Sequence, residues 1–236
     1  MNPLLVVTGG TKGIGKAIIS KFMAEKYDVI TCARNEADLV KLQKEMSLTY
    51  PDQSLETFTA DLSDAAETQE FLQFIKKKNR NIEVLINNTG VFMPGQIHNE
   101  AEGVLEKTIE TNVYSAYRMT RGLVADMIKV RKGHIFNICS TASIMAYPNG
   151  GSYCISKFAL LGMTKVLREE MKAFDVKVTA ILPGATYTDS WQGTDLPEER
   201  FISSKDIAET IWSAKSLSNS ALIEEILIRP QLGDLD

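Results

Sequence analysis

The chain has 236 residues, 44% of them hydrophobic, and a formal net charge of −4 at pH 7. This composition can bury a core of ordinary size, and α/β proteins of about 200–250 residues commonly fold as one domain. Because no Pro/Gly/Ser-rich stretch, charge block or repeat divides the chain, we predict a single domain over residues 1–236. The acidic balance excludes a typical nucleic-acid partner. No apolar run approaches the roughly 20 residues that cross a bilayer, so we expect no membrane partner.

The cysteines are Cys32, Cys139 and Cys154, an odd number without a closely spaced pair. This pattern predicts a reduced, cytoplasmic protein with neither a disulfide framework nor a zinc or other metal site. The chain enters a strand pattern at Pro3–Val7 with no charged leader before it, which also favours a cytoplasmic location.

Short apolar, β-branched runs alternate with amphipathic segments along the chain. In chain order, strands are expected at Leu4–Thr8, Asp28–Cys32, Leu55–Ala60, Val84–Asn87, His134–Cys139, Lys177–Leu182 and Ile223–Ile228. Helices are expected between them at Ile14–Lys26, Ala37–Met46, Ser63–Lys78, Val104–Lys129, Gly151–Ala173 and Ser204–Ser216. Asn35 and Ser63 have the residue type and position of helix N-caps. The alternation predicts an α/β fold, a doubly wound parallel sheet of about seven strands that binds ligands at the strands' carboxyl ends.

The first expected strand leads into Thr8-Gly9-Gly10-Thr11-Lys12-Gly13-Ile14-Gly15. Such a turn lets the backbone approach a phosphate, which the free N–H groups of the following helix can bind. The P-loop pattern fits from Gly10 to Lys16 but fails at Ala17, where a Mg²⁺-binding Ser or Thr is needed. The G-x-G-x-x-G dinucleotide pattern fails at Thr11 and Ile18. We therefore predict a nucleotide site of the pattern T-G-x-x-x-G-x-G, with a tight ligand-free connection as the alternative.

A second group of residues can move a proton onto a carbonyl oxygen. Tyr153 and Lys157 are four apart, so in a helix both side chains lie on one face. A free phenol has a pKa near ~10, and an adjacent ammonium favours the phenolate, which suits a general acid/base. Ser140 directly follows an apolar strand and could polarise the carbonyl oxygen, although it could also cap the next segment; Ser143 is a rival. Together with the glycine-rich turn, these residues predict hydride transfer between a nicotinamide cofactor and a carbonyl.

The chain resembles the short-chain dehydrogenase/reductase family over nearly its whole length. The resemblance rests on the glycine-rich turn, on Asp61-Leu62, on Asn87-Asn88-Thr89-Gly90, on Asn112, Ser140, Tyr153 and Lys157 in order, and on Pro183-Gly184 with Thr188. It departs at Thr89, where the family has Ala, and at Thr186, where it often has Val or Ile. The resemblance implies a Rossmann fold with a catalytic tetrad of Ser140, Tyr153, Lys157 and Asn112. In it, Lys157 also binds the nicotinamide ribose, and Asn112 holds a water that links Lys157 to solvent.

The cofactor-binding residues expected on this resemblance are Thr8, Gly9, Thr11, Lys12, Gly13, Ile14, Gly15, Arg34, Asn35, Asp61, Leu62, Asn88, Gly90, Tyr153, Lys157, Pro183, Gly184, Thr186 and Thr188. Ala33 stands where relatives that prefer NAD tend to carry Asp. Arg34 follows it, and Lys12 lies in the glycine-rich turn. Because Arg and Lys can bind a ribose 2′-phosphate, we predict NADP(H) rather than NAD(H). The alternative is that both are solvated surface charges.

The expected substrate is a small or extended carbonyl compound. Residues 189–203 are polar with one Trp and suit a lid, and Met93, Met145, Tyr147 and Trp191 are candidates for the pocket wall. Within the family, 3-oxoacyl-carrier-protein reductases and sepiapterin-reductase-like enzymes are the nearest likenesses. The resemblance also implies a homotetramer or dimer, formed through the helices after the fourth and fifth strands and the apolar last strand. The competing class is a non-enzymatic NADP(H)-binding sensor or scaffold, which the complete tetrad disfavours.

Three further residues are interpreted without a catalytic role. His134 begins a strand, and Cys154 lies beside Tyr153 as a packed thiol. His98 lies in a loop near the site, where an ordinary surface role is favoured over substrate contact.

Overall fold

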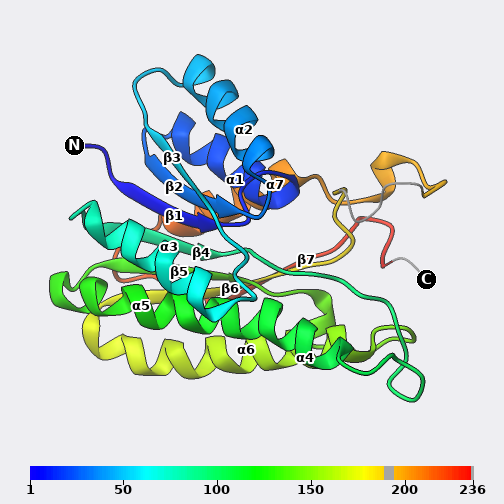
Figure 1. Ribbon diagram of the computed structural model, residues 1–236. Coiled ribbons are helices and arrows are strands. Elements are labelled where there is room, and N and C mark those ends of the chain that lie inside the picture. Colours follow the sequence, from blue (N-terminus) through cyan, green and yellow to red (C-terminus); the bar gives the residue numbers. More distant parts are fainter. Residues whose placement is uncertain (189–193, 235–236) are drawn as a thin grey trace.

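The computed structural model describes residues 1–188 and 194–234 (Figure 1). Its strands are β1 (Leu4–Thr8), β2 (Asp28–Ala33), β3 (Leu55–Thr59), β4 (Ile82–Asn87), β5 (Gly133–Ile138), β6 (Val176–Pro183) and β7 (Glu225–Ile228). Its α-helices are α1 (Gly13–Ala24), α2 (Glu36–Thr49), α3 (Ala65–Lys77), α4 (Val104–Ile109), α5 (Ser115–Val130), α6 (Gly151–Met171) and α7 (Ser204–Lys215). A π-helical turn, η1 (Glu110–Tyr114), joins α4 to α5, and single 3₁₀ turns lie at η2 (Thr141–Ser143), η3 (Lys172–Phe174) and η5 (Glu198–Arg200).

The seven strands form one sheet in the order β3-β2-β1-β4-β5-β6-β7, and every neighbouring pair is parallel. The strand order reverses between β1 and β4, which is where such sheets bind their ligands. The register brings Thr8 opposite Cys32 and Asn87 opposite Asn137, so the strands finish near one another. This topology confirms the predicted fold class.

Helices cover both faces of the sheet (Figure 1). One buried cluster joins the sheet to α1, α2 and α7 through residues such as Ile18, Leu42 and Ile211. A second cluster joins the other face to α3, α5 and α6 through Phe71, Leu123 and Met171. Since both faces are buried, strands such as Leu4–Thr8 read as continuous apolar runs rather than alternating ones.

A buried chain of polar side chains ties the helices of the second face to the sheet. The Asn87 amide nitrogen donates to the Thr120 hydroxyl oxygen (3.1 Å) and to Asn137 Oδ1 (2.8 Å). Asn137 in turn donates to the Thr164 hydroxyl oxygen (2.8 Å). These contacts fix α5 against β4 and α6 against β5, directly below the strand ends that carry the candidate site.

Two local predictions were wrong. Asn35 caps α2 as expected, but the cap of α3 is Asp64, whose carboxylate accepts the backbone N–H groups of Ala66 (2.7 Å) and Glu67 (2.9 Å). Ser63 instead donates its hydroxyl to Asp61 (2.8 Å). The predicted helix Val104–Lys129 is interrupted by η1, because i→i+5 bonding at Glu110–Tyr114 replaces one α-helical turn.

Candidate active site

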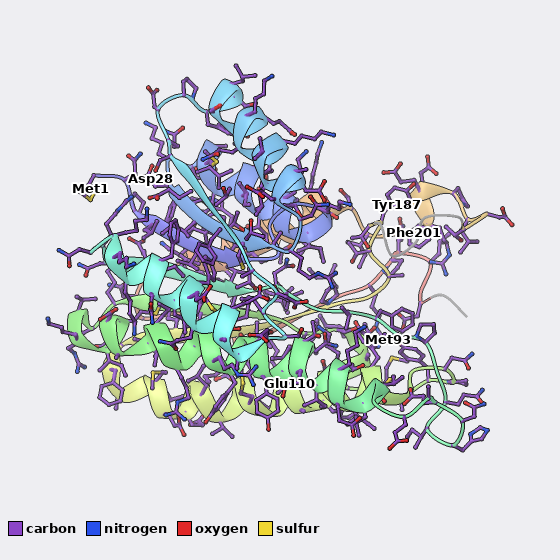
Figure 2. The ribbon with its side chains drawn as sticks, in the orientation of Figure 1. Met1, Asp28, Met93, Glu110, Tyr187 and Phe201 are labelled. Atoms are coloured by element: carbon purple, nitrogen blue, oxygen red, sulfur yellow. The ribbon has the colours of Figure 1, made fainter. Side chains whose placement is uncertain are left out.

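Most of the predicted site residues lie at the carboxyl ends of the strands, at one end of the molecule. Figure 2 marks this end by Met93, Tyr187 and Phe201, and the opposite end by Met1 and Asp28. The loops after β1, β2, β3, β4, β5 and β6 all emerge here, so motifs that are distant in sequence meet at one edge of the sheet.

The glycine-rich turn presents the N-terminus of α1 to this edge. Gly9 (φ +68°) and Gly13 (φ +50°) have left-handed backbone, which favours glycine. A Cβ on Gly15 would lie 2.2 Å from the Gly9 carbonyl oxygen, so only glycine allows the turn to close. No side chain caps α1 at Lys12, and its first turn contains no acidic residue. An anionic group therefore fits the free N–H groups here, as a dinucleotide phosphate requires.

The ends of β1 and β4 hold each other in place. The Thr8 hydroxyl oxygen accepts the backbone N–H groups of Asn88 and Thr89, each at 3.0 Å. The Asn88 amide nitrogen donates to the carbonyl oxygens of Thr8 (2.9 Å) and Gly9 (3.0 Å). Thr8 and Asn88 thus stabilise the conformation of the turn, and both side chains are already engaged in hydrogen bonds within the fold. The Thr89 side chain is half-buried next to Gly9.

Two cations and two acids lie where the adenine ribose is expected. Arg34 follows β2, with its side chain 69% exposed and its guanidinium 4.0 Å from Asp61. Lys12 lies 3.6 Å from Asp38. Burial raises the pKa of the Asp61 carboxyl, but hydrogen bonds from Ser63 and the Arg34 charge outweigh it, so that pKa lies below its usual value. The four groups form an exposed, mixed-charge surface that can rearrange around a phosphate.

The Asn35 side chain accepts the backbone N–H of Asp38 (3.1 Å) as the cap of α2, and Leu62 is buried beside Asp61. Both residues lie at the predicted position, at the ends of β2 and β3. Their side chains are already engaged in the fold, so any contact with a cofactor would come mainly from their backbones.

Lys157 and Tyr153 lie together beneath the end of β5, and Ser140 follows that strand at the start of η2. The Lys157 ammonium is buried and donates to the Ile138 carbonyl oxygen at 2.8 Å. It lies 5.7 Å from the centre of the Tyr153 ring, so the spacing of four on α6 does place both residues on one face. Gly90, at the end of β4, lies close to this group, because a Cβ there would be 3.3 Å from Asn112 Oδ1 and 3.6 Å from Lys157 Nζ.

Ser140 and Ser143 share a capping box at η2. The Ser140 hydroxyl oxygen accepts the Ala142 N–H (3.1 Å), and the Ser143 hydroxyl oxygen accepts the Ser140 N–H (3.2 Å). The capping role considered for Ser140 is therefore present, yet its hydroxyl proton remains available for donation. Ser143 is 2% exposed and Ser140 is 9% exposed, which favours Ser140 as the group that reaches a substrate.

Asn112 lies inside the π-helical turn and is fully buried. Its Oδ1 accepts the Val91 N–H (2.7 Å), and its Nδ2 donates to the Val91 carbonyl oxygen (3.0 Å) and the Ser156 hydroxyl oxygen (2.9 Å). Both amide hydrogens are therefore used to hold the chain after β4 against α6. A water near Asn112 would have to bind Oδ1 or the backbone of the π-helical turn.

Two residues near Tyr153 were missed by the sequence analysis. The Phe92 ring packs edge-on against Tyr153, with 4.9 Å between centroids. The Glu100 carboxylate accepts the Ser152 backbone N–H (2.9 Å) and the Ser152 hydroxyl, and these bonds lower the Glu100 pKa. Glu100 thus caps α6, whose own N-cap Gly150 has no side chain and whose first turn has no acid. No spacing signal could reveal a cap from 52 residues away.

The segment after β6 crosses over the glycine-rich turn. The Gly184 N–H donates to the Ile228 carbonyl oxygen (2.8 Å), and the Thr186 hydroxyl donates to the Gly184 carbonyl oxygen (3.0 Å). Pro183 ends β6, and Thr188 faces Gly13, where a Cβ would lie 2.9 Å from the Thr188 methyl carbon. The predicted cofactor segment and the turn therefore approach each other from opposite sides.

The predicted lid begins beyond this segment. Tyr187 pairs its backbone with Ile202 and packs its ring against Phe201, which holds the two ends of the loop together (Figure 2). Of the candidate pocket residues, Met93 lies at this end of the molecule and Met145 contacts the Arg229 guanidinium (3.4 Å). The Tyr147 carbonyl oxygen accepts the Gly150 N–H (3.1 Å) just before α6. Burial and then the neighbouring Tyr153 raise the Tyr147 pKa above its usual value. Trp191 and the rest of residues 189–193 lie outside the described residues.

The three cysteines are buried, and His98 is exposed. Burial raises the pKa of Cys32 to about 12 and that of Cys139 to about 11, so both are protonated thiols. Cys154 is buried against Gly150, and His98 is exposed on the segment after β4. Across residues 1–188 and 194–234, no group of His, Cys, Asp and Glu could hold a metal ion. No helix in these ranges is long and apolar enough to span a membrane.

A family model for the short chain dehydrogenases matches residues 3–199 of the chain. The chain is 32% identical over 247 residues to the sepiapterin reductase of Chlorobaculum tepidum, an alignment that covers 100% of this chain and 99% of that protein. It is 29% identical over 188 residues to a 3alpha-hydroxysteroid dehydrogenase of Mediterraneibacter gnavus, which covers 80% of this chain and 75% of that one.

Solved structures agree with the sequence relatives. A metagenomic short-chain oxidoreductase in complex with NADP superposes with a TM-score of 0.84 at 27% identity over 97% of both chains. The closed form of a serine dehydrogenase complexed with NADP⁺ gives 0.84 at 26% identity over 95% of this chain and 94% of that one. With the sheet order and the strand-end site described above, these matches show that the chain belongs to the short chain dehydrogenase family of NAD(P)-binding oxidoreductases.

Proposed function

We propose that the protein is an NADP(H)-dependent reductase of small carbonyl compounds, working reversibly as an alcohol dehydrogenase within one domain. The observation that carries this proposal is the position of Lys157. Its buried ammonium is held by the Ile138 carbonyl oxygen, lies on the same helix face as Tyr153, and lies beside Gly90 at the end of β4. A protein that only bound a nucleotide would have no need of this arrangement.

In this proposal, a bound NADPH supplies the hydride, and the protein supplies the proton and the charge stabilisation. Tyr153 donates its hydroxyl proton to the substrate carbonyl oxygen. Ser140 donates a second hydrogen bond to the same oxygen as negative charge develops there. Lys157 gives one of its three N–H groups to Ile138, which leaves two for the Tyr153 hydroxyl and the cofactor ribose. Asn112 fixes Val91 against α6 and so keeps the loop after β4 open for the nicotinamide.

The preference for NADP(H) rests on Ala33, Arg34 and Lys12. The position at the end of β2 carries no carboxylate that would repel a 2′-phosphate, and both cations lie at the adjoining surface. Two structural relatives above 25% identity are described as complexes with NADP or NADP⁺, which supports the same choice.

The test is NADPH oxidation against ketones, diketones, 3-oxoacyl thioesters and pterins, the last prompted by the sepiapterin reductase relative. Wild-type protein is expected to turn over at least one class. Tyr153→Phe is expected to lose about 10²- to 10⁴-fold in kcat with little change in NADPH affinity, since it removes only the transferable proton. Tyr50→Phe, far from the site, serves as the matched control. Turnover that survives in Tyr153→Phe would overturn the mechanism, and NADPH binding without turnover of any class would favour a sensor.

We also propose that the protein assembles as a dimer or tetramer through the outer face of α5 and α6. Large apolar side chains are exposed there, among them Tyr117 (43%), Phe158 (47%) and Val166 (60%). The edge strand β7 adds Leu227, exposed at 49%. Light scattering is expected to give a multiple of the 26.2 kDa chain mass, reduced by Phe158→Glu but unchanged by Leu48→Glu on the exposed side of α2. A monomeric wild-type mass would refute the assembly.

A further inference from the structure

A cavity of about 590 Å³ opens at the end of the molecule opposite to the candidate active site. It lies among the starts of β4, β5 and β6 and the C-terminal ends of α5, α6 and α7, at the end where the N-terminus lies in Figure 1. Since β5 has six residues, the cavity and Ser140 are separated by about 20 Å. A volume of this size is typical of sites for small molecules.

The cavity wall is strongly basic although the chain is acidic overall. Six basic side chains line it against two acidic ones, Glu83 and Asp175. The basic residues are Arg131, Lys132, Arg168, Lys172, Lys177 and Lys215.

Three of these cations have carboxylate partners of their own. The pairs are Arg131 with Asp175 (2.6 Å), Arg168 with Glu224 (3.5 Å) and Lys172 with Glu169 (2.6 Å). The uncompensated positive charge therefore lies at the other three, Lys132, Lys177 and Lys215.

One carboxylate, Glu83, serves both Lys132 (3.2 Å) and Lys215 (2.9 Å). Lys177 donates to the Ser218 carbonyl oxygen (2.6 Å), and no acidic group of the described residues lies within ion-pair distance of it. Arg168 is 4% exposed and uses two of its nitrogens on the carbonyl oxygens of Val178 (2.9 Å) and Glu224 (2.5 Å).

Two titratable groups respond to this positive potential. Burial, and then the charge of Lys215, lower the pKa of Lys177. Burial, and then the charges of Lys177 and Lys215, lower the pKa of His134 to about 3. Both effects indicate cations held close together at a partly dehydrated surface, where an anion would be stabilised.

We propose that this cavity binds a small polyanion, a metabolite that carries a phosphate or several carboxylates. Lys177 and Lys215 provide the charge that a bound anion would neutralise, and Lys132, which shares Glu83 with Lys215, lines the same cavity. The volume exceeds that of a lone phosphate, so the ligand carries an organic body that contacts the loop at Ser216–Leu222. This site is separate from the 2′-phosphate surface at Arg34.

The protein has two histidines, one for each end of the molecule, and they allow a direct test. His134 lines the cavity, and His98 lies on the segment after β4. Histidine labelled with ¹⁵N would be followed by NMR in protein saturated with NADPH, during titration with pyrophosphate and, separately, citrate at constant ionic strength. A saturable shift of the His134 signals, without one at His98, is the expected result for at least one of the two probes.

The variant Lys177→Met with Lys215→Met is expected to weaken that binding at least about tenfold per lost charge, and Lys177→Met alone is tested in case the pair disturbs folding. The matched control is Lys41→Met with Lys44→Met on the exposed side of α2, which removes the same charge elsewhere. Absence of a His134 shift with both probes would overturn the proposal, as would binding that is equally weakened by the control. The readout requires no turnover, so it is independent of the proposed reductase activity.

Discussion

At the scale of single residues, the proposed preference for NADP(H) depends on the end of β2. Ala33 has no carboxylate, and the exposed Arg34 guanidinium lies 4.0 Å from the Asp61 carboxylate. A second carboxylate at the end of β2 would repel the 2′-phosphate of NADPH. We expect Arg34→Glu to raise the KM for NADPH about 10- to 100-fold, which corresponds to the roughly 1.5–3 kcal/mol of a charge-assisted hydrogen bond. The KM for NADH should change little or fall, because its ribose hydroxyls can donate to the new carboxylate.

Steady-state kinetics with both cofactors would check this expectation. Lys44→Glu makes the same change of charge on the exposed side of α2 and should leave both KM values alone. An Arg34→Glu enzyme that still preferred NADPH by the wild-type ratio would show that Arg34 plays no part in the choice.

The residue types at the site could be predicted from the sequence, but the contacts that these residues make could not. The pattern around Thr8 and Asn88 predicts cofactor binding, yet the two side chains lie 80 positions apart and bond to each other's backbone. Asn112 is a second example. The family resemblance predicts that this residue holds a water, whereas in the structure its side-chain amide bonds to Val91 and Ser156. Side-chain hydrogen bonds between distant strand ends depend on the closed fold, which residue spacing does not encode.

At the scale of elements, α6 depends on a distant residue for its start. Gly150 offers no cap, and Glu100 can reach the first turn only because Gly95 and Gly151 have no Cβ. A Cβ at either position would collide with the Glu100 side chain. We expect Glu100→Ala to lower kcat about 10- to 100-fold, since Tyr153 follows Ser152 directly and small displacements of a catalytic group are costly. The KM for NADPH should change much less, because the phosphate turn lies on α1. Glu100→Gln should recover part of the loss, since its amide oxygen can still accept the Ser152 N–H.

Separate determination of kcat and KM for the two variants would test this role, with Glu102→Ala as a nearby exposed control. Wild-type kcat in Glu100→Ala would contradict it. A merely structural cap would lower the melting temperature without separating kcat from KM, and it would give no rescue by Gln.

The errors at element boundaries have local causes. Ser63 and Asp64 are both favourable N-cap residues. Ser63 is not the cap because the Asp61 carboxylate accepts both its hydroxyl and its backbone N–H. The long helix from Val104 is amphipathic throughout, so its periodicity gives no sign of the π-helical turn. That turn is stabilised by tertiary contacts of Asn112, and such bulges are common at functional sites.

At the scale of the whole molecule, the alternation of strands and helices was sufficient to predict a parallel sheet covered on both faces, because each unit must bury two faces of a strand. It did not predict the polar chain from Thr120 through Asn87 and Asn137 to Thr164, which is hidden among apolar runs. Nor did it predict the basic cavity, since its cations come from separate elements that meet only in the folded sheet.

The stability of the folded molecule should depend on pH through His134, which is 3% exposed at the start of β5. The Thr179 hydroxyl donates to the Ile223 carbonyl oxygen (2.6 Å), so it must accept its other bond from His134 Nε2–H (2.8 Å). Nδ1 is then the unprotonated nitrogen, and it has no partner among the described residues. Protonating it would bury an unpaired charge beside Lys177 and Lys215, which agrees with a pKa lowered to about 3.

Below the ordinary histidine pKa of about 6.5, the unfolded chain binds a proton at this position and the folded protein does not. The free energy of unfolding should therefore fall as the pH falls, by about 1.4 kcal/mol per unit or about 2 kcal/mol between pH 6.5 and 5. Asp28 and Asp61, whose pKa values are lowered, add to this loss only at more acidic pH. Urea unfolding in phosphate-free buffer would measure the slope. His134→Asn should be less stable at pH 7 yet lose this dependence, whereas His98→Asn should keep it; equal slopes in wild type and His134→Asn would mean that the imidazole charges without penalty in the folded state.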